Sequence, residues 1–180
     1  MDDPLLFVVS FPELAASDQI WVESHREGHD PNASLLGAHF TLAFALQNVS
    51  EADLIKHLHA IAAQARQIPF TIRHACVGHD HAKARFHGFL VPDEGSSCIT
   101  LLRRTLHTGC LEGHLHPEIP FQPHITIATS DDAHRMQALC DDVNRELRPI
   151  SGVLSELHLV RHSQRGVETV EAFKLSAEHV

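Results

Sequence analysis

Two short segments of the sequence share the pattern histidine, apolar residue, threonine, apolar residue. They run from His39 to Leu42 and from His124 to Ile127. The chain has 17 histidines, so a bare His-x-Thr triplet is expected about 0.8 times by chance, and roughly 0.14 times when the other two positions must be apolar. Two such segments are expected in only about one chain in a hundred of this composition. Their joint presence favours a shared function.

The side chains of these segments suit phosphodiester chemistry that needs no metal. Imidazole has an ordinary pKa of about 6.5, so near neutral pH one histidine can accept a proton while another donates one. Two histidines on opposite sides of phosphorus can serve an in-line displacement, and threonine hydroxyls can donate to the non-bridging oxygens. We therefore predict His39 and His124 as catalytic residues, and Thr41 and Thr126 as phosphate-binding residues.

Strand geometry explains how each histidine and threonine could face one site. Side chains of a strand alternate between its two faces, so His39 and Thr41 point one way and the apolar residues between and after them point to the core. The same holds for His124 and Thr126. For either segment alone, a histidine satisfied by ordinary hydrogen bonds is the simpler explanation; the two segments together favour a site.

Strands and helices follow one another along the chain without a low-complexity linker. Strands are predicted at 5–11, 38–46, 70–77, 84–91, 121–129, 153–160 and 167–175, and amphipathic helices at about 13–26, 51–68, 99–111 and 131–148. Each half of the chain contains a helix and one His-x-Thr strand. This repeat predicts an α+β fold in which two antiparallel sheets, related by a pseudo-two-fold axis, line a central cleft with helices outside. Residues 1–180 then form one domain of two lobes, about 1–90 and 91–180, which could exchange strands.

The composition limits the partners. The chain has 14 Lys and Arg against 23 Asp and Glu, a formal net charge of −9, and such a chain repels long duplex nucleic acid. A short phosphate-bearing ligand in a local pocket is still allowed. The N-terminus lacks a basic signal region, the apolar stretch from Leu5 to Val9 is too short to span a bilayer, and the four cysteines form no C-x-x-C pair. We expect a cytoplasmic monomer with reduced, mostly buried cysteines and no membrane partner.

The sequence resembles the 2H phosphoesterase superfamily, and within it the bacterial branch of 2′-5′ RNA ligase-like proteins. The two His-x-Thr tetrads are the signature of that superfamily, and the segments 69–72, 157–161 and 173–175 are also similar to the branch. The resemblance covers nearly the whole chain. It implies a bilobal α+β fold and a nucleotide or a short RNA end as substrate.

The resemblance also implies a reaction. This is hydrolysis or transesterification of a 2′-5′ linkage, a 2′,3′-cyclic phosphate or ADP-ribose 1″,2″-cyclic phosphate, with no cofactor. By similarity, His124 activates the nucleophile and His39 protonates the leaving oxygen. Two positions depart from the usual pattern: Ala38 stands where relatives often have proline, and His162 follows Arg161 where they often have serine.

Further candidates for substrate binding are an arginine and several phenylalanines. Arg161 could bind a terminal phosphate, and Phe7 and Phe11 could stack on a base. Phe86 and Phe89 could take the same role, but aromatic residues at strand spacing usually belong to the core. Exposed arginines are likewise most often solvated.

Other histidines of the chain invite a metal-binding interpretation. His79 and His81 form one pair and His114 and His116 another, but neither has the partner spacing of a zinc site. No metal site is therefore predicted. Two alternative functions stay open from the sequence: a module that binds a nucleotide or an RNA end with little turnover, and a histidine-rich metal-binding protein.

Overall fold

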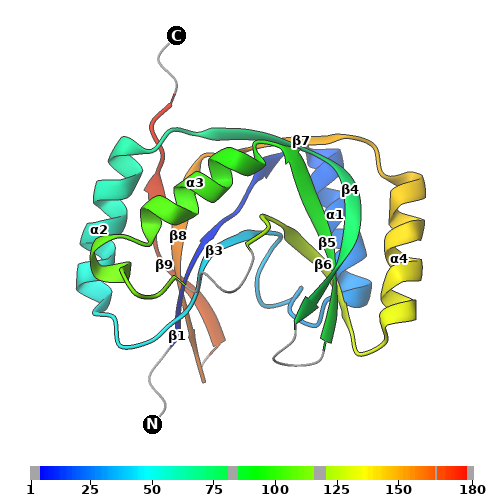
Figure 1. The fold of residues 1–180 in the computed structure, drawn as a ribbon, viewed down its shortest axis with the longest axis horizontal. Helices are drawn as coiled ribbons and strands as arrows, with labels where there is room; N and C mark the ends of the chain where they lie inside the picture. The colour runs from blue at the N-terminus through cyan, green and yellow to red at the C-terminus, as the bar shows by residue number, and fades with distance from the viewer. Residues whose placement is uncertain (1–4, 81–84, 116–120, 165, 178–180) are drawn as a thin grey trace.

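The computed structural model describes residues 5–80, 85–115, 121–164 and 166–177. Figure 1 shows their arrangement. The strands are β1 (Leu5–Ser10), β2 (Glu13–Leu14), β3 (Phe40–Leu46), β4 (Ile68–Asp80), β5 (Arg85–Glu94), β6 (Ile125–Ser130), β7 (Ile150–Leu154), β8 (Glu156–Ser163) and β9 (Gly166–Lys174). The α-helices are α1 (Ala16–His29), α2 (Glu51–Gln64), α3 (Ser96–Leu106) and α4 (Ala133–Glu146), with a 3-10 turn at Gly109–Leu111.

The strands form a curled sheet in the order β2-β7-β4-β5-β6-β3-β1-β8-β9. Every pairing between named strands is antiparallel, which confirms the predicted α+β class. The two expected sheets meet where β3 pairs with β6 through Phe40 and Ile125, so they are continuous. Each half of the sheet takes strands from both halves of the sequence, because the chain passes from one sheet half to the other between β1 and β2, β2 and β3, β3 and β4, and β7 and β8.

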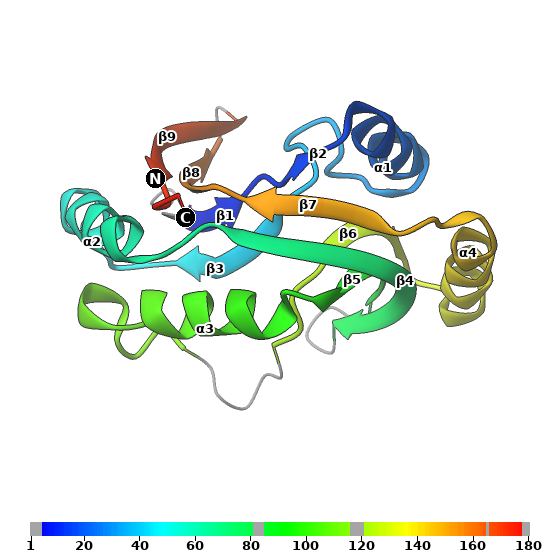
Figure 2. The ribbon, with the colours of Figure 1, turned by 90° about the horizontal axis from the view of Figure 1, so that it is seen from above.

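The helices pack around the curled sheet. Figure 2 shows α2 at one end of the molecule and α4 at the other; α2 contacts β8 and β9, α4 contacts β4, β5 and β6, and α1 contacts β6, whereas α3 contacts β3 as well as β4 and β5. On α2, the side chain of Ser50 accepts a hydrogen bond from the Asp53 backbone N–H, and Leu54, Leu58 and Ala62 face the core.

The start of α4 differs from the prediction. Ser130 belongs to β6, and the N-cap is Asp132, whose carboxylate accepts two backbone N–H groups of the first turn. Ala133, Met136, Cys140, Val143 and Leu147 recur at helical spacing, which predicts one buried stripe. Met136, Cys140 and Val143 are buried, whereas Ala133 is exposed because it lies in the first turn, outside the packed part of the helix.

Some element boundaries also differ from the prediction. The helix α1 begins at Ala16, because Glu13 and Leu14 pair with β7 instead. His79, which lies between the predicted strands 70–77 and 84–91, belongs to β4. His81 and residues 116–120 fall outside the described residues.

The cysteines and the helices bear on two further expectations. All four cysteines are free, but only Cys140 is buried, while Cys98 and Cys110 are exposed. The expectation of mostly buried thiols is therefore wrong for two positions, which lie on α3 and on the 3-10 turn at the surface. No helix within the described residues has both the length and the apolar character needed to cross a membrane.

Candidate active site

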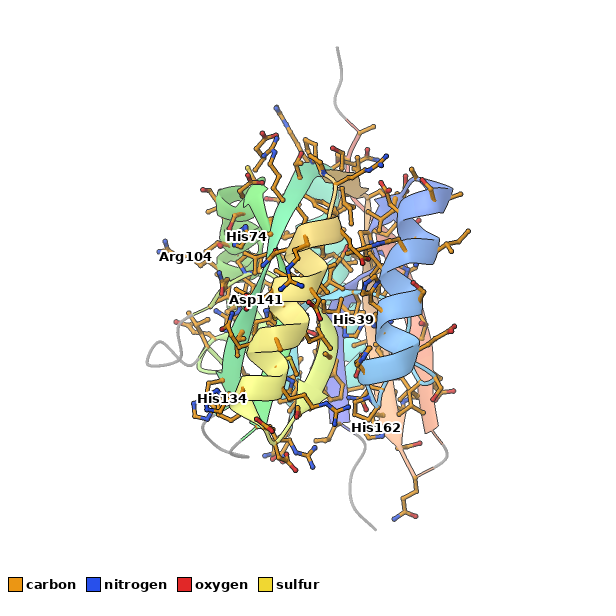
Figure 3. The ribbon with its side chains drawn as sticks, turned by 90° about the vertical axis from the view of Figure 1, so that its right-hand side faces the viewer. His39, His74, Arg104, His134, Asp141 and His162 are labelled. Carbon is orange, nitrogen blue, oxygen red and sulfur yellow. The ribbon has the colours of Figure 1, made fainter. Side chains whose placement is uncertain are left out.

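His39 and His124 occupy equivalent positions in the sheet. His39 directly precedes β3 and His124 directly precedes β6, and the first residues of these strands, Phe40 and Ile125, are paired. Both of these residues are buried, which anchors the junction of the two sheet halves in the core. The histidines next to them are therefore held at the same junction. Figure 3 labels His39, which lies between α1 and α4 in that view.

The register of this pairing brings the threonines to the histidines. In an antiparallel pair, extending the match of Phe40 with Ile125 by one residue in each direction sets His39 opposite Thr126 and His124 opposite Thr41. Each threonine therefore neighbours the histidine of the other segment. Because successive residues alternate between faces, all four polar side chains lie on the face away from the core. The structure thus brings together the four residues that the sequence singles out.

Both imidazole rings are held by the same kind of hydrogen bond. The Nδ1 atom of His39 lies 2.7 Å from the carbonyl oxygen of Gly37. The Nδ1 atom of His124 lies 2.7 Å from the carbonyl oxygen of Gln122. A carbonyl oxygen only accepts, so in each ring Nδ1 carries the proton and donates it. The other nitrogen, Nε2, is then a free base in the neutral ring.

The segment before His39 is fixed by a buried ion-pair network on α1. Arg26 is only 1% exposed and donates to Glu23 at 2.8 Å and to Asp30 at 2.9 Å. Glu23 in turn accepts the backbone N–H of Ala38 at 2.7 Å. Sequence reasoning missed this support, although the spacing of three and four residues on a helix was a signal for it.

A phenylalanine supports the ring of His124. Phe89 stacks on His124 with ring centroids 3.7 Å apart and an interplanar angle of 20°, and on His87 at 5.7 Å and 3°. Gly78 leaves space for the Phe89 ring, since a Cβ atom there would lie 2.0 Å from it. Sequence reasoning favoured the core for Phe89; the ring is half-buried and contacts the site.

In the other half of the sheet, a phenylalanine again lies between the central histidine and a second histidine. Phe11 lies 6.2 Å from His39 and 4.7 Å from His158 between ring centroids, in edge-to-face geometry. His158 Nε2 is 3.4 Å from a carboxylate oxygen of Glu156. The sequence singled out Phe11 but not His158; their chain positions are far apart, and only the pairing of β1 with β8 brings them together.

Burial sets the protonation of the two central histidines. The pKa of His124 is lowered to about 4, chiefly through desolvation by burial and to a smaller extent by the nearby His87 and His39, against the opposing effect of the hydrogen bond to the Gln122 carbonyl. Burial also lowers the pKa of His39. His124 is therefore neutral near neutral pH and can act as a proton acceptor through Nε2.

Arg161 and Phe7 lie away from the two histidines. Arg161 donates to Glu51 at the start of α2 and to Glu168 on β9, at 2.5 and 2.6 Å, and both carboxylates raise its pKa. Its guanidinium thus lies on the face of β8 that α2 covers. Phe7 contacts Phe44 edge-to-face at 5.4 Å.

Two cavities near the sheet are not lined by His39 or His124. One, of about 1220 Å³, lies between α2, α3, β4 and β7. The other, of about 350 Å³, lies between the end of α1, β6 and α4. Within the described residues, no group of three or more His, Cys, Asp or Glu side chains is placed to hold a metal ion.

Comparison with known proteins identifies one family and one fold. The family model described as the 2′-5′ RNA ligase superfamily matches residues 12–166. No curated protein matches. E. coli LigT complexed with 3′-AMP is 22% identical, with a TM-score of 0.60 over 97% of this chain and 99% of that one.

Two structures with lower sequence identity share the same fold. TT0787 of Thermus thermophilus is 19% identical, with a TM-score of 0.62 over 97% of this chain and 100% of that one. Kluyveromyces marxianus Usb1 is 12% identical, with a TM-score of 0.55 over 95% of this chain and 98% of that one.

Proposed function

Because this chain belongs to the 2′-5′ RNA ligase superfamily of 2H phosphoesterases, we propose that it is a phosphodiesterase for 2′-linked or cyclic phosphates of nucleotides or RNA ends. The substrate is a 2′,3′-cyclic phosphate or a 2′-5′ linkage. E. coli LigT, which has the same fold, has been solved with 3′-AMP, ATP and NADP+, and this supports a nucleotide as the ligand class. We expect the protein to work in the cytoplasm as a monomer.

One observation carries the proposal. Two neutral imidazoles, each with Nδ1 held by a backbone carbonyl, present Nε2 on one face of the sheet. A phosphate between them can be attacked from the side of one ring and lose its leaving group on the side of the other, as in-line displacement requires. The two threonines stand next to the opposite histidines, where their hydroxyls can donate to the non-bridging oxygens.

The assignment of the two proton transfers rests on the stronger lowering of the pKa of His124. His124 has the more strongly lowered pKa, about 4, so it takes the proton from the attacking water. The negative charge of a bound phosphate raises the pKa of His39 and favours its protonated form, so His39 donates a proton from Nε2 to the leaving ribose oxygen. One P–O bond forms, one breaks, and each histidine ends in the state that the other began in.

Hydrolysis assays in EDTA test the proposal. The panel holds the four nucleoside 2′,3′-cyclic phosphates, ADP-ribose 1″,2″-cyclic phosphate and a 2′-5′-linked adenylate, with wild type, His39→Ala and His124→Ala. General acid–base groups contribute about 10²- to 10⁴-fold, so each variant loses at least about a hundredfold in rate. His134→Ala, at an exposed position on α4, is the matched control and keeps full activity.

Each other outcome has a distinct meaning. Full activity in either site variant, with folding checked by thermal denaturation, contradicts the two-histidine mechanism. Tight binding of a cyclic end without product supports the alternative, a nucleotide or RNA-end binding module. Activity that EDTA abolishes and zinc restores supports a metal-dependent protein instead.

A further inference from the structure

A single peptide unit connects His39 to a carboxylate on α1. The Nδ1 atom of His39 donates to the carbonyl oxygen of Gly37 at 2.7 Å. The N–H group of the same planar peptide belongs to Ala38 and donates to Oε1 of Glu23, also at 2.7 Å. The carboxylate of Glu23 and the imidazole of His39 therefore hold opposite ends of one rigid amide group.

The second histidine of the site has no such connection. The Nδ1 atom of His124 donates to the carbonyl oxygen of Gln122, and the nitrogen atom of that peptide belongs to Pro123. Proline has no backbone N–H, so no carboxylate can hold this peptide from its other end. The two imidazoles share one kind of hydrogen bond, but that of His39 alone continues to an acidic side chain.

The carboxylate of Glu23 is fixed in place for this contact. Its Oε2 atom accepts from Arg26 at 2.8 Å, and its Oε1 atom also accepts from Gln19 at 3.1 Å. Arg26 is buried and donates in turn to the carbonyl oxygen of Leu36 at 2.8 Å. The peptides on both sides of Gly37 are therefore tied to α1.

The carboxylate at one end of the peptide strengthens the hydrogen bond at the other end. Hydrogen bonds in a chain polarise one another, and those to charged groups are the stronger ones, so the Gly37 oxygen gains negative charge. A more negative acceptor holds the Nδ1 proton of His39 and stabilises the imidazolium form. Burial lowers the pKa of His39 most and Arg26 lowers it as well, whereas the hydrogen bond to Gly37, Asp30 and Glu23 raise it.

We propose that Glu23 is a positioning residue for His39: through the Gly37–Ala38 peptide it fixes the Nδ1 proton and favours the protonated ring, which then donates from Nε2 to the leaving oxygen. This inference rests on the proposed function. A carboxylate that accepts directly from Nδ1 holds the tautomer of the histidine in hydrolase triads; here one peptide stands between the two groups. The connection gives a structural reason why His39 rather than His124 is the proton donor.

Other charged and titratable groups also face His39. Among the described residues they come from α1, from β6 and, behind Phe11, from β8: Arg26 and Asp30, His124, and His158 with Glu156. All of them are retained in a variant of Glu23. A change in the titration of His39 in that variant therefore reports the loss of the Glu23 carboxylate.

The first measurement needs no substrate. Protein with isotope-labelled histidine is titrated by NMR as wild type, Glu23→Gln and Glu23→Ala, and the spectrum of His39→Gln assigns the His39 signals. In Glu23→Ala the two tautomers of the neutral His39 ring mix, and the ring is protonated at lower pH than in wild type. Glu23→Gln keeps an oxygen for the Ala38 N–H and thus the tautomer, but without the charge it is also protonated at lower pH. Glu27→Gln, at an exposed position one turn further along α1, is the matched control and titrates as wild type.

The second measurement is a pH–rate profile on the cyclic phosphate that wild type hydrolyses fastest. Misplacing a reacting group costs up to roughly 10²-fold in rate, so Glu23→Ala lowers kcat by about 10- to 100-fold with little change in KM, and Glu23→Gln recovers most of that rate. The proton donor must be protonated in the enzyme–substrate complex, so the basic limb of kcat moves to lower pH in both variants. The acidic limb, which His124 sets, stays in place.

A double variant tests the hydrogen bond itself. Ala38→Pro removes the donor and leaves every charge in place, so it lowers kcat much as Glu23→Ala does. Together the two changes cost little more than either alone, because both break the same hydrogen bond. Proline also restrains the backbone before β3, so the Glu23 variants decide the question if Ala38→Pro does not fold.

The two measurements separate this inference from the proposed function. If wild type hydrolyses no substrate of the panel but Glu23→Ala changes the tautomer and the titration of His39, the positioning by Glu23 stands and the proposed function falls. If tautomer, titration and basic limb are all unchanged, Glu23 is not a positioning residue, even where the variant unfolds more easily. A changed tautomer with an unmoved basic limb in an active enzyme, or an equal shift in Glu27→Gln, overturns the inference as well.

Discussion

Gly78 offers a sharp perturbation of the candidate site, although it touches neither catalytic candidate. A methyl group at Gly78 would lie 2.0, 2.5 and 2.7 Å from three carbon atoms of the Phe89 ring. Real Cβ contacts are never this short, so Gly78→Ala forces the ring to move. The other side of the ring is stacked on His124 at 3.7 Å, so the ring cannot move without disturbing that histidine.

The size of the effect follows from packing. Overpacking of this kind destabilises a protein by about 1–3 kcal/mol, and loss of an aromatic stack contributes about 0.5–1.5 kcal/mol of that. The pKa of His124 changes as well. Burial holds it at about 4, and less burial lets it rise toward its ordinary value of about 6.5.

The assays are urea unfolding and a pH–rate profile on a cyclic-phosphate substrate. In wild type, His124 stays neutral and active as a base down to about pH 4, whereas in Gly78→Ala the acidic limb of kcat/KM moves to higher pH. Gly28→Ala is the control: no atom lies within 4 Å of the added methyl group. Because Gly28 lies in α1, alanine there stabilises the helix by up to about 1 kcal/mol.

A double variant tests the contact between Gly78 and Phe89 directly. In Phe89→Leu the flat ring is gone, so adding Gly78→Ala to it costs much less than adding Gly78→Ala to wild type. An equal cost in both backgrounds would refute the contact. A neutral Gly78→Ala with an unchanged pH profile would refute both the packing and its link to His124.

Three further predictions concern stability and binding. Because the pKa of His124 is lowered from 6.5 to about 4, the imidazole of the unfolded chain is protonated first as pH falls, and the free energy of unfolding decreases between pH 6.5 and 4. In urea unfolding, wild type loses about 3 kcal/mol more stability than His124→Gln from pH 7 to pH 4. Equal losses in the two proteins would contradict this. Arg26→Ala leaves buried Asp30 without its partner and destabilises the chain by about 3–5 kcal/mol in thermal or urea unfolding, whereas a loss below about 1 kcal/mol would show the network is unimportant. The guanidinium of Arg161 is paired with two carboxylates on the side of β8 that faces α2. Arg161→Ala therefore lowers the free energy of unfolding by at most about 1 kcal/mol and changes KM less than twofold. A large rise in KM would instead support phosphate binding by Arg161.

The local features of the site could be predicted from the sequence. His39 with Thr41 and His124 with Thr126 could be found because their spacing of two residues matches the alternation of a strand. The helices could be found for a similar reason, since the apolar period of α2 and its Ser50 cap are local patterns. Such signals depend on residues that are neighbours in the chain.

Which distant residues meet could be known from the folded chain alone. The register of Phe40 with Ile125 sets each threonine beside the opposite histidine, and no local pattern specifies that pairing. Likewise, Phe89 and Gly78 lie on the neighbouring strands β5 and β4. The Phe89 ring fits over Gly78 and stacks on His124 only because β4, β5 and β6 pack side by side.

The burial of the two imidazoles is also a property of the folded chain. A histidine in the sequence has an ordinary pKa near 6.5, and only the surrounding side chains lower that of His124 to about 4. The exposure of Phe44 is a similar case, since the irregular pairing of β1 with β3 between Thr41 and Ala43 turns it toward the face of Thr41. Desolvation and strand register depend on contacts between segments far apart in the chain, and the spacing of residues along one segment carries no record of them.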